Sequence, residues 1–192
     1  CYDQTEFTIS SAKNKLKLTD KKVILFFGYI KPYKGLDILI EAFSLFRNKF
    51  ENSHLLIVGE VYGNSETYLK LIKKKNLKED VTFIDRFVAD DEIELYFKAA
   101  DVLALPYKQA TQSGVVQIAY DMNLGAVATP IGGLPELVVH KKTGIVAKTT
   151  KPTDFSKALI EYFSLEHKTI KQNIKDVSEN YSWDSFANLI MQ

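Results

Sequence analysis

Short runs of consecutive apolar residues alternate along this chain with longer segments whose apolar residues recur every three or four positions. The unbroken runs are rich in β-branched residues, a pattern typical of strands that are buried on both faces of a parallel sheet. The pattern predicts strands over residues 23–27, 55–58, 81–84, 102–105, 126–129 and, as a last short strand, 144–147.

The segments between these runs have the spacing of amphipathic helices. In one of them Leu36, Leu39, Ile40 and Phe43 fall on a single helical stripe. Asp90 or Asp91 is the expected N-cap of another. Helices are predicted over residues 35–50, 65–75, 90–99 and 113–123, with a short one opening at 132–136 and helical structure from 152 onward, broken near 166 and near 180.

Five alternations of strand and helix predict an α/β fold, in which a Rossmann-like doubly wound parallel sheet is covered by helices on both faces. Ligands of such sheets bind beyond the carboxyl ends of the strands. The loops that follow Phe27, Val58, Ile84, Leu105 and Thr129 are therefore the candidates for chemistry.

Composition narrows the class of protein. The chain has 192 residues, 46% of them hydrophobic, which fits one globular domain. Its 25 basic and 24 acidic residues nearly cancel, so no global field attracts nucleic acid or an anionic membrane, and an anion site has to be local. The single cysteine, Cys1, cannot form an internal disulfide, which favours a reducing, cytoplasmic location.

The ends of the sequence suggest a part of a longer protein. Cys1 is not an initiator methionine, so we expect the chain to begin inside a longer protein or to be trimmed. Residues 1–20 are polar and lack the apolar core of a signal peptide, and they are predicted to form a lead-in linker. No apolar run is long enough for an integral membrane segment.

The first loop combines a glycine with two lysines. Gly28 allows a tight turn at the strand end, and Lys31 and Lys34 lie where a helix begins, a favourable place for phosphate. The loop is neither Gly-x-Gly-x-x-Gly nor a P-loop, which disfavours a dinucleotide or ATP site. Alternatively, the lysines are solvated residues near a helix cap.

The fourth and fifth loops each open a helix. At Ser113 and Gly114 the backbone amides of the helix N-terminus would be free to form a second anion-binding site. Alternatively, Ser113 is only the N-cap residue of that helix. In the fifth loop, Gly132 and Gly133 permit close backbone approach. Glu136 is either a ligand or a first-turn acid that complements the helix dipole.

In this order and spacing, these loops resemble the donor domain of the GT-B glycosyltransferases, in the retaining group known as family four or glycosyl transferases group 1. The resemblance covers residues 21 to about 165. It rests on Gly28 with Lys34-Gly35, Ala99-Ala100-Asp101 through Pro106, Gly132-Gly133-Leu134-Pro135-Glu136, and Thr143-Gly144.

The resemblance implies the C-terminal half of a GT-B fold that binds a UDP- or GDP-sugar and needs no metal. The implied diphosphate-binding residues are Gly28, Lys31, Lys34, Ser113, Gly114 and Val115; the nucleoside and ribose residues are Arg86, Phe87 and Gln117; the sugar-binding residues are Thr111, Gln112, Gly132 and Gly133; and the catalytic residues are Lys34, Thr111 and Glu136.

The sequence departs from the family at two places. Tyr29 stands where the family usually has an arginine. Lys31 could supply the missing positive charge, although a lysine cannot form the bidentate hydrogen bonds that an arginine makes to phosphate. Thr111 and Ala119 occupy the positions of the two usual glutamates. Thr111-Gln112-Ser113-Gly114 with Gln117 resembles a variant pattern of the same superfamily.

The resemblance also implies a domain organisation. Residues 1–20 would link to an acceptor domain that is absent from this chain, residues 21–165 would bind the donor, and residues 166–192 would form helices packed on that domain. The expected partners are the nucleotide-sugar and, through the missing domain, a glycan or lipid-linked acceptor in polysaccharide biosynthesis. The expected location is cytoplasmic, or peripheral at the inner face of the membrane.

Other interpretations stay open. The missing glutamates suit a catalytically degenerate nucleotide-sugar-binding module that acts as a scaffold or sensor, and an unrelated Rossmann-like domain is a third possibility. His54, His140 and His167 lack metal-ligand spacing, so no metal site is predicted. The five lysines between residues 70 and 78 form either a solvated helix face or a contact for acidic lipid.

Overall fold

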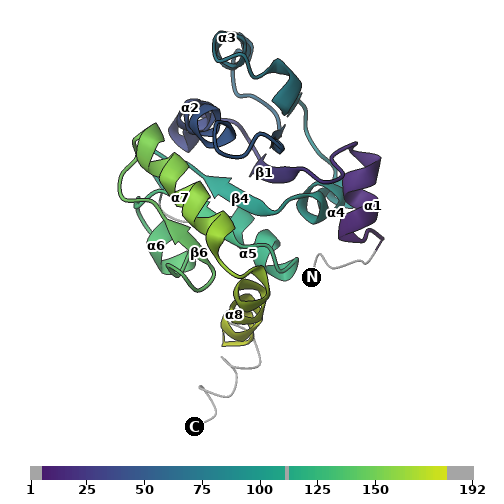
Figure 1. Ribbon diagram of the computed structural model, residues 1–192, viewed down its shortest axis with the longest axis vertical. Helices are drawn as coiled ribbons and strands as arrows, with labels where there is room; N and C mark the ends of the chain where they lie inside the picture. Colours follow the sequence, from purple (N-terminus) through teal and green to yellow (C-terminus); the bar gives the residue numbers. More distant parts are fainter. Residues whose placement is uncertain (1–5, 111–112, 181–192) are drawn as a thin grey trace.

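A six-stranded parallel sheet forms the centre of the computed structural model, which describes residues 6–110 and 113–180 (Figure 1). The strands are β1 (Lys22–Phe27), β2 (Ser53–Val58), β3 (Val81–Ile84), β4 (Val102–Leu105), β5 (Ala126–Ala128) and β6 (Gly144–Val146). Their order is β3-β2-β1-β4-β5-β6, so the chain reverses direction across the sheet between β1 and β4. The predicted α/β fold is confirmed, and β1 and β4 flank its switch point.

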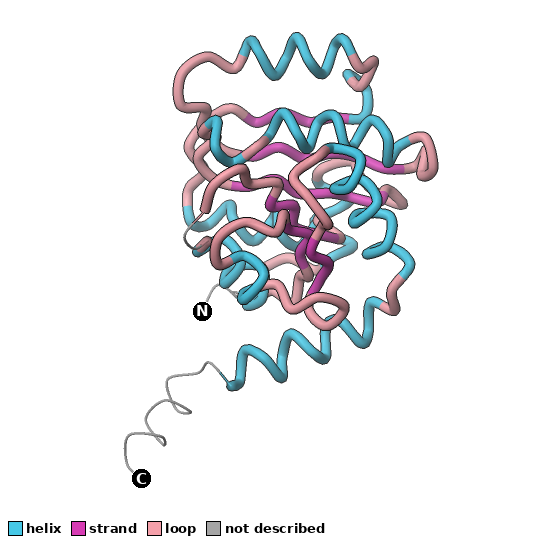
Figure 2. The backbone as a smooth tube through the Cα atoms, turned by 90° about the vertical axis from the view of Figure 1, so that its left-hand side faces the viewer, coloured by secondary structure: helices cyan, strands magenta, loops and turns pink. Residues whose placement is uncertain are grey.

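Helices cover both faces of the sheet (Figure 2). Helix α2 packs on both α3 and α7, whereas α1 packs on α4, and α5 packs on α8. The helices are α1 (Ile9–Lys15), α2 (Leu36–Arg47), α3 (Glu66–Lys74), α4 (Asp90–Ala99), α5 (Gly114–Asp121), α6 (Leu134–Leu137), α7 (Pro152–Ser164) and α8 (His167–Asn180), with 3-10 turns η1 (Pro32–Lys34) and η2 (Lys78–Asp80). Within the described ranges, none has the length and apolar character needed to cross a bilayer.

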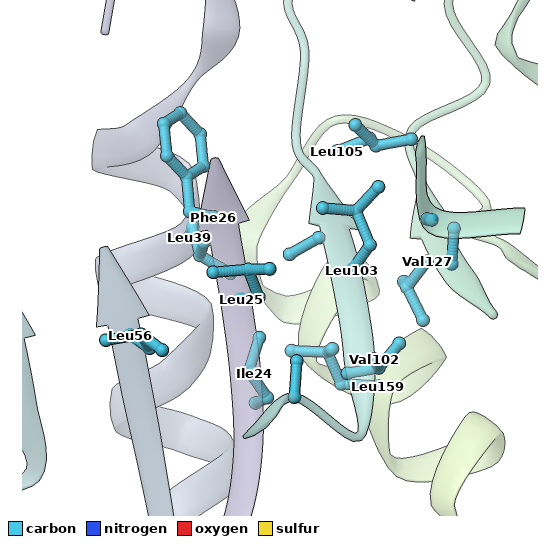
Figure 3. Packing of buried hydrophobic residues seen from close by; sticks show 14 of the residues in the cluster. Ile24, Leu25, Phe26, Leu39, Leu56, Val102, Leu103, Leu105, Val127 and Leu159 are labelled. Atoms are coloured by element: carbon cyan, nitrogen blue, oxygen red, sulfur yellow. The ribbon is translucent and has the colours of Figure 1, made fainter. Parts of the chain in front are cut away.

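The central strands are apolar on both faces because helices cover both. In β1, Ile24 and Leu25 are fully buried, and Leu25 lies in register with Leu56 of β2. Leu39 of α2 and Leu159 of α7 belong to the same buried cluster (Figure 3). Burial of each such side chain contributes about 1.5–3 kcal/mol, which explains why the strands read as unbroken apolar runs.

Residues 1–20, predicted as a linker, contain helix α1. Thr8 caps it: the Thr8 hydroxyl accepts from the Ser11 amide at 3.1 Å, and the Ser11 hydroxyl accepts from the Thr8 amide at 2.9 Å. Lys13 then ties the helix to the sheet, with its ammonium 2.7 Å from the Asp101 carboxylate. That carboxylate also accepts the Val23 amide at 2.7 Å. A tertiary ion pair thus fixes a segment whose sequence is polar.

The predicted cap of α4, Asp90 or Asp91, is wrong by one or two residues. Ala89 occupies the N-cap position, and it makes no side-chain cap hydrogen bond. Asp90 and Asp91 lie in the first turn instead, where acidic side chains complement the positive end of the helix dipole.

Candidate functional site

A cleft of about 480 Å³ opens at the switch point, beyond the carboxyl ends of β1 and β4. Residues from the first and fourth of the predicted loops line it: Tyr33, Lys34, Tyr107, Gln109, Ala110, Ser113, Gly114 and Val115. The structure therefore brings together four residues assigned in advance, Lys34, Ser113, Gly114 and Val115.

Lys34 is a half-buried cation at this cleft. Its ammonium lies 5.8 Å from the centre of the Tyr107 ring, and no carboxylate of the described residues forms an ion pair with it. Burial, reinforced by the positive charge of Lys31, lowers the pKa of Lys34 from 10.5 to about 8. An anion in the cleft would supply the missing counter-charge and raise the pKa again.

Gly28 stands directly beside the Lys34 ammonium. Its φ of +98° is a conformation that L-residues with side chains rarely adopt. A Cβ at this position would lie 3.2 Å from Lys34 Nζ and 3.7 Å from Val115 Cγ2. Glycine thus allows the strand to turn here and leaves the space beside the ammonium open.

Tyr107, which the sequence did not single out, joins three loops. It is 3% exposed, and its ring meets that of Tyr33 edge-on at 6.4 Å. Its hydroxyl lies 3.3 Å from Ser113 Oγ, and its carbonyl accepts the Thr129 hydroxyl at 2.6 Å. The first, fourth and fifth loops are therefore held in fixed relation by one buried side chain and its own carbonyl.

The N-terminus of α5 faces the same cleft. Ser113 is the N-cap residue, but its side chain does not cap the helix, because its hydroxyl is directed to Tyr107. Gly114, exposed and without a side chain, and Val115 follow at the cleft wall. The positive end of the helix dipole and the Lys34 ammonium thus act on the same volume, which suits a phosphate.

A second cavity of about 180 Å³ lies on the other side of Gly28. Phe87 lines it with a ring that is 64% exposed. The other residues that line it are Phe27, Gly28, Tyr29, Gly59, Glu60, Arg86, Val88, Asp90 and Ile93.

The Arg86 side chain is already hydrogen-bonded to residues close to it in the sequence. Its guanidinium donates two hydrogen bonds to the Glu92 carboxylate, at 2.6 and 2.7 Å, and one to the Phe87 carbonyl at 3.1 Å. The bond to Glu92 raises the pKa of Arg86 and lowers that of Glu92. Arg86 therefore holds the loop that presents Phe87, and its fork is already occupied.

Lys31 does not line the main cleft. Its ammonium lies 5.6 Å from the centre of the Tyr62 ring, in the loop after β2. The two loops are joined because the Ile30 amide donates to the Glu60 carbonyl at 2.8 Å, and the Tyr62 amide to the Ile30 carbonyl at 3.0 Å. Tyr29, at the family's arginine position, is 52% exposed.

The remaining candidates are placed less directly. Gln117 is exposed on α5 and lines neither cavity, and Glu136 is exposed on α6. Gly132, at φ +55°, packs against the Ala110 carbonyl, and Gly133 is the N-cap residue of α6. Thr111 and Gln112 lie outside the described residues.

The position of the second family glutamate is also informative. Ala119 is fully buried on α5. The helix thus presents a core-facing methyl group where the family usually has a carboxylate.

The described residues contain no group of three or more His, Cys, Asp or Glu side chains that could hold a metal ion. Among the residues that the structure describes, the main cleft offers one lysine ammonium and one helix N-terminus. Both groups stabilise negative charge on a ligand.

Known proteins share this sequence and fold. The model of the family "Glycosyl transferases group 1" matches residues 8–189. D-inositol 3-phosphate glycosyltransferase of Corynebacterium efficiens is 28% identical over 173 residues, which are 86% of this chain and 41% of that protein. The chain thus spans about two fifths of the length of this relative.

Solved structures show the same fold. The C-terminal domain of the glycosyl transferase group 1 family protein LpcC from Francisella tularensis superposes with a TM-score of 0.80 at 21% identity, covering 92% of this chain and 94% of that one. Anabaena Alr3699/HepE, in complex with UDP and glucose, superposes with a TM-score of 0.80 at 23% identity, covering 95% and 50%.

Proposed function

The chain belongs to the group 1 glycosyltransferases, and from this membership we propose that its switch-point cleft binds the diphosphate of a nucleoside-diphosphate sugar. One observation carries the proposal: a half-buried ammonium, Lys34, without an acidic partner among the described residues, beside the N-terminus of α5. Such a pair of positive groups at one cleft favours the binding of a diphosphate.

The two cavities suggest how the rest of the donor lies. The nucleoside would occupy the smaller cavity, where the exposed Phe87 ring offers a face to a base, and the diphosphate would pass Gly28 to reach Lys34. The sugar would extend toward Gly132 and Gly133 of the fifth loop, which packs on Ala110 at the cleft wall. Gly28 lies between the two parts of the bound donor, because it lines the smaller cavity and a Cβ at its position would contact Lys34 and Val115 of the main cleft.

We propose a hexosyl transfer in which Lys34 and the α5 amides stabilise the charge that develops on the departing diphosphate. A UDP-sugar is the first donor to test, because the similar Alr3699/HepE is known with UDP and glucose. The acceptor, a glycan or a lipid-linked glycan, would bind to the acceptor half of the whole protein.

A second candidate function rests on the buried Ala119. Because neither this position nor the described lining of the cleft provides a carboxylate, the domain could bind a nucleotide-sugar without transferring it, as a scaffold or sensor. Both candidate functions require binding of the nucleotide-sugar, and only the first requires transfer of the sugar to an acceptor.

Calorimetric titration of the chain with UDP, GDP and ADP tests the proposal. We expect one nucleotide to bind selectively and Lys34→Ala to weaken it at least tenfold, because a charge-assisted hydrogen bond contributes about 1.5–3 kcal/mol. Lys108→Ala is the matched control, since Lys108 lies in the fourth loop but is paired with Asp37 at 2.8 Å. If the folded chain bound none of the three nucleotides, or if Lys34→Ala bound as tightly as the native chain, the proposal would fail.

A further inference from the structure

A third hollow, an open groove of about 330 Å³, lies along the outer edge of the sheet, where β3 is separated from β1 by β2. Strand β3 is the outermost strand on this side, and α3 and η2 border it. Figure 1 places α3 at the end of the molecule opposite to α8. The groove is therefore a feature of the lateral surface, and the proposed donor site does not use it.

The wall of the groove is apolar. Leu69 and Ile72 contribute from α3, and Val81 and Phe83 contribute from one face of β3, where alternate residues point the same way. Ile72 is buried at 5% exposure, but Leu69 remains 48% exposed, and Val81 and Phe83 are only half-buried. Apolar surface thus continues from the core to solvent along this edge.

Lysines surround this apolar wall. Lys70, Lys73 and Lys78 line the groove, and residues 66–79 contain five lysines against two acids, although the whole chain carries a net charge of only +1. Lys70 pairs with Glu66 at 3.0 Å on the exposed helix surface. Lys73 and Lys78 form no ion pair with any residue in the described part of the chain.

Protection of the edge strand explains part of this pattern. Lysines beside an edge strand discourage its pairing with another chain. That role requires charge near β3, but it does not require an exposed leucine on α3 or an open apolar groove beside it. A ligand that is anionic on one side and apolar on the other accounts for both features.

We propose that the edge formed by α3, η2 and β3 docks on the surface of an anionic lipid bilayer. The lysine ammoniums would lie at the level of the lipid phosphates, and Leu69, with the groove behind it, would meet the acyl boundary. The carboxyl edge of the sheet, with the switch-point cleft, stays free in this arrangement. The proposal does not depend on nucleotide binding.

Co-sedimentation of the nucleotide-free chain with vesicles tests this docking. We expect the chain to bind vesicles of phosphatidylcholine with one third phosphatidylglycerol, and to bind pure phosphatidylcholine at least tenfold more weakly. The triple variant Lys70→Glu, Lys73→Glu and Lys78→Glu should lose at least tenfold in partition coefficient, and Leu69→Ser should lose severalfold.

Matched variants elsewhere on the surface serve as controls. Lys148→Glu, Lys151→Glu and Lys168→Glu reverse three exposed lysines outside the groove, and Leu45→Ser replaces a leucine of α2 that is 42% exposed. Both should bind anionic vesicles more tightly than the groove variants do, with unfolding midpoints in urea confirming that all variants fold. Failure of the native chain to bind anionic vesicles would overturn the proposal. So would equal losses in the groove and control variants.

Discussion

At the scale of single residues, the site depends on a cation that folding makes less basic. Burial and the nearby charge of Lys31 keep the pKa of Lys34 near 8, so the folded chain holds this proton less firmly than the unfolded chain does. Protein stability is therefore reduced by the same residue that would bind the ligand. Such an opposition is common at binding sites, where a group is held ready for a partner at a cost in stability.

This opposition predicts a specific dependence of stability on pH. Below pH 8 Lys34 is charged in both states, and its burial destabilises the fold fully; between pH 8 and 10.5 only the unfolded state keeps the proton, so the penalty shrinks as pH rises. Lys34→Met should therefore be more stable than the native chain at pH 7, and this advantage should narrow toward pH 10.5. Urea unfolding of both proteins at pH 7, 8.5 and 10 measures the difference, and an advantage that did not change with pH would contradict the assignment.

Gly28 offers a second prediction at the same scale. Gly28→Ala should cost about 1–2 kcal/mol in stability, because an L-residue is strained at its φ of +98°. It should also weaken UDP binding, because the new methyl group would contact the Lys34 ammonium.

Gly63→Ala is the control for this substitution. Gly63 has a similar φ of +104°, and a Cβ there would meet nothing within 4 Å. We expect a similar loss of stability with unchanged UDP affinity. Calorimetry and urea unfolding on both variants separate the two effects, and equal affinities for UDP would show that Gly28 serves the turn alone.

At the scale of secondary-structure elements, the apolar pattern predicted most of the sheet. Strands β3 and β4 have the predicted bounds. For the fully buried β4 the reason is that a strand covered on both faces needs an unbroken apolar run, whereas the partly buried edge strand β3 tolerates Thr82 within its run. Helix α1 was not predicted. Thr8 and Ser11 cap it locally, but the contact that ties it to the sheet joins Lys13 to the distant Asp101, and no local sequence pattern encodes that contact.

The candidate site was predictable to a similar degree. Lys34 and the start of α5 were found because a glycine, a lysine and a helix start are local signals. The role of Tyr107 was not predictable from the sequence. Its partners Tyr33, Ser113 and Thr129 are separated from it along the chain, and their residue types do not mark a binding site. Ala119 could be recognised as a departure from the family, but only the structure shows that it faces the core.

The joining of the loops by Tyr107 leads to a prediction at this scale. Tyr107→Phe removes the hydrogen bond to Ser113 and should cost about 1 kcal/mol in stability. Because Ser113 begins α5 at the cleft, UDP affinity should fall severalfold. Tyr120→Phe is the matched control: the buried Tyr120 hydroxyl bonds Thr143 and the Leu137 carbonyl, away from the cleft.

These two tyrosines separate positioning of the site from general stability. We expect both variants to unfold at lower urea concentrations and only Tyr107→Phe to bind UDP more weakly in calorimetry. A parallel loss of affinity in Tyr120→Phe would show that the site responds to any loosening of the domain.

At the scale of the whole molecule, the described cleft supplies positive charge but no carboxylate. Its lining offers Lys34 and the start of α5 to a leaving diphosphate, whereas Glu136 stays exposed on α6, outside the lining. The chain covers 41% of the length of its D-inositol 3-phosphate glycosyltransferase relative. Under the proposed function, the described residues account for binding of the donor but not for activation of an acceptor.

This difference between binding and activation predicts that the chain by itself binds a donor without turning it over. Incubation with UDP-glucose, with and without simple sugar acceptors, should release no UDP above the buffer rate, although calorimetry detects UDP binding under the same conditions. Lys34→Ala distinguishes a true reaction from a contaminant. If the native chain released UDP at a sustained rate and Lys34→Ala did not, the catalytic groups would lie within these 192 residues, and Glu136→Gln would then test the one carboxylate that was predicted to be catalytic.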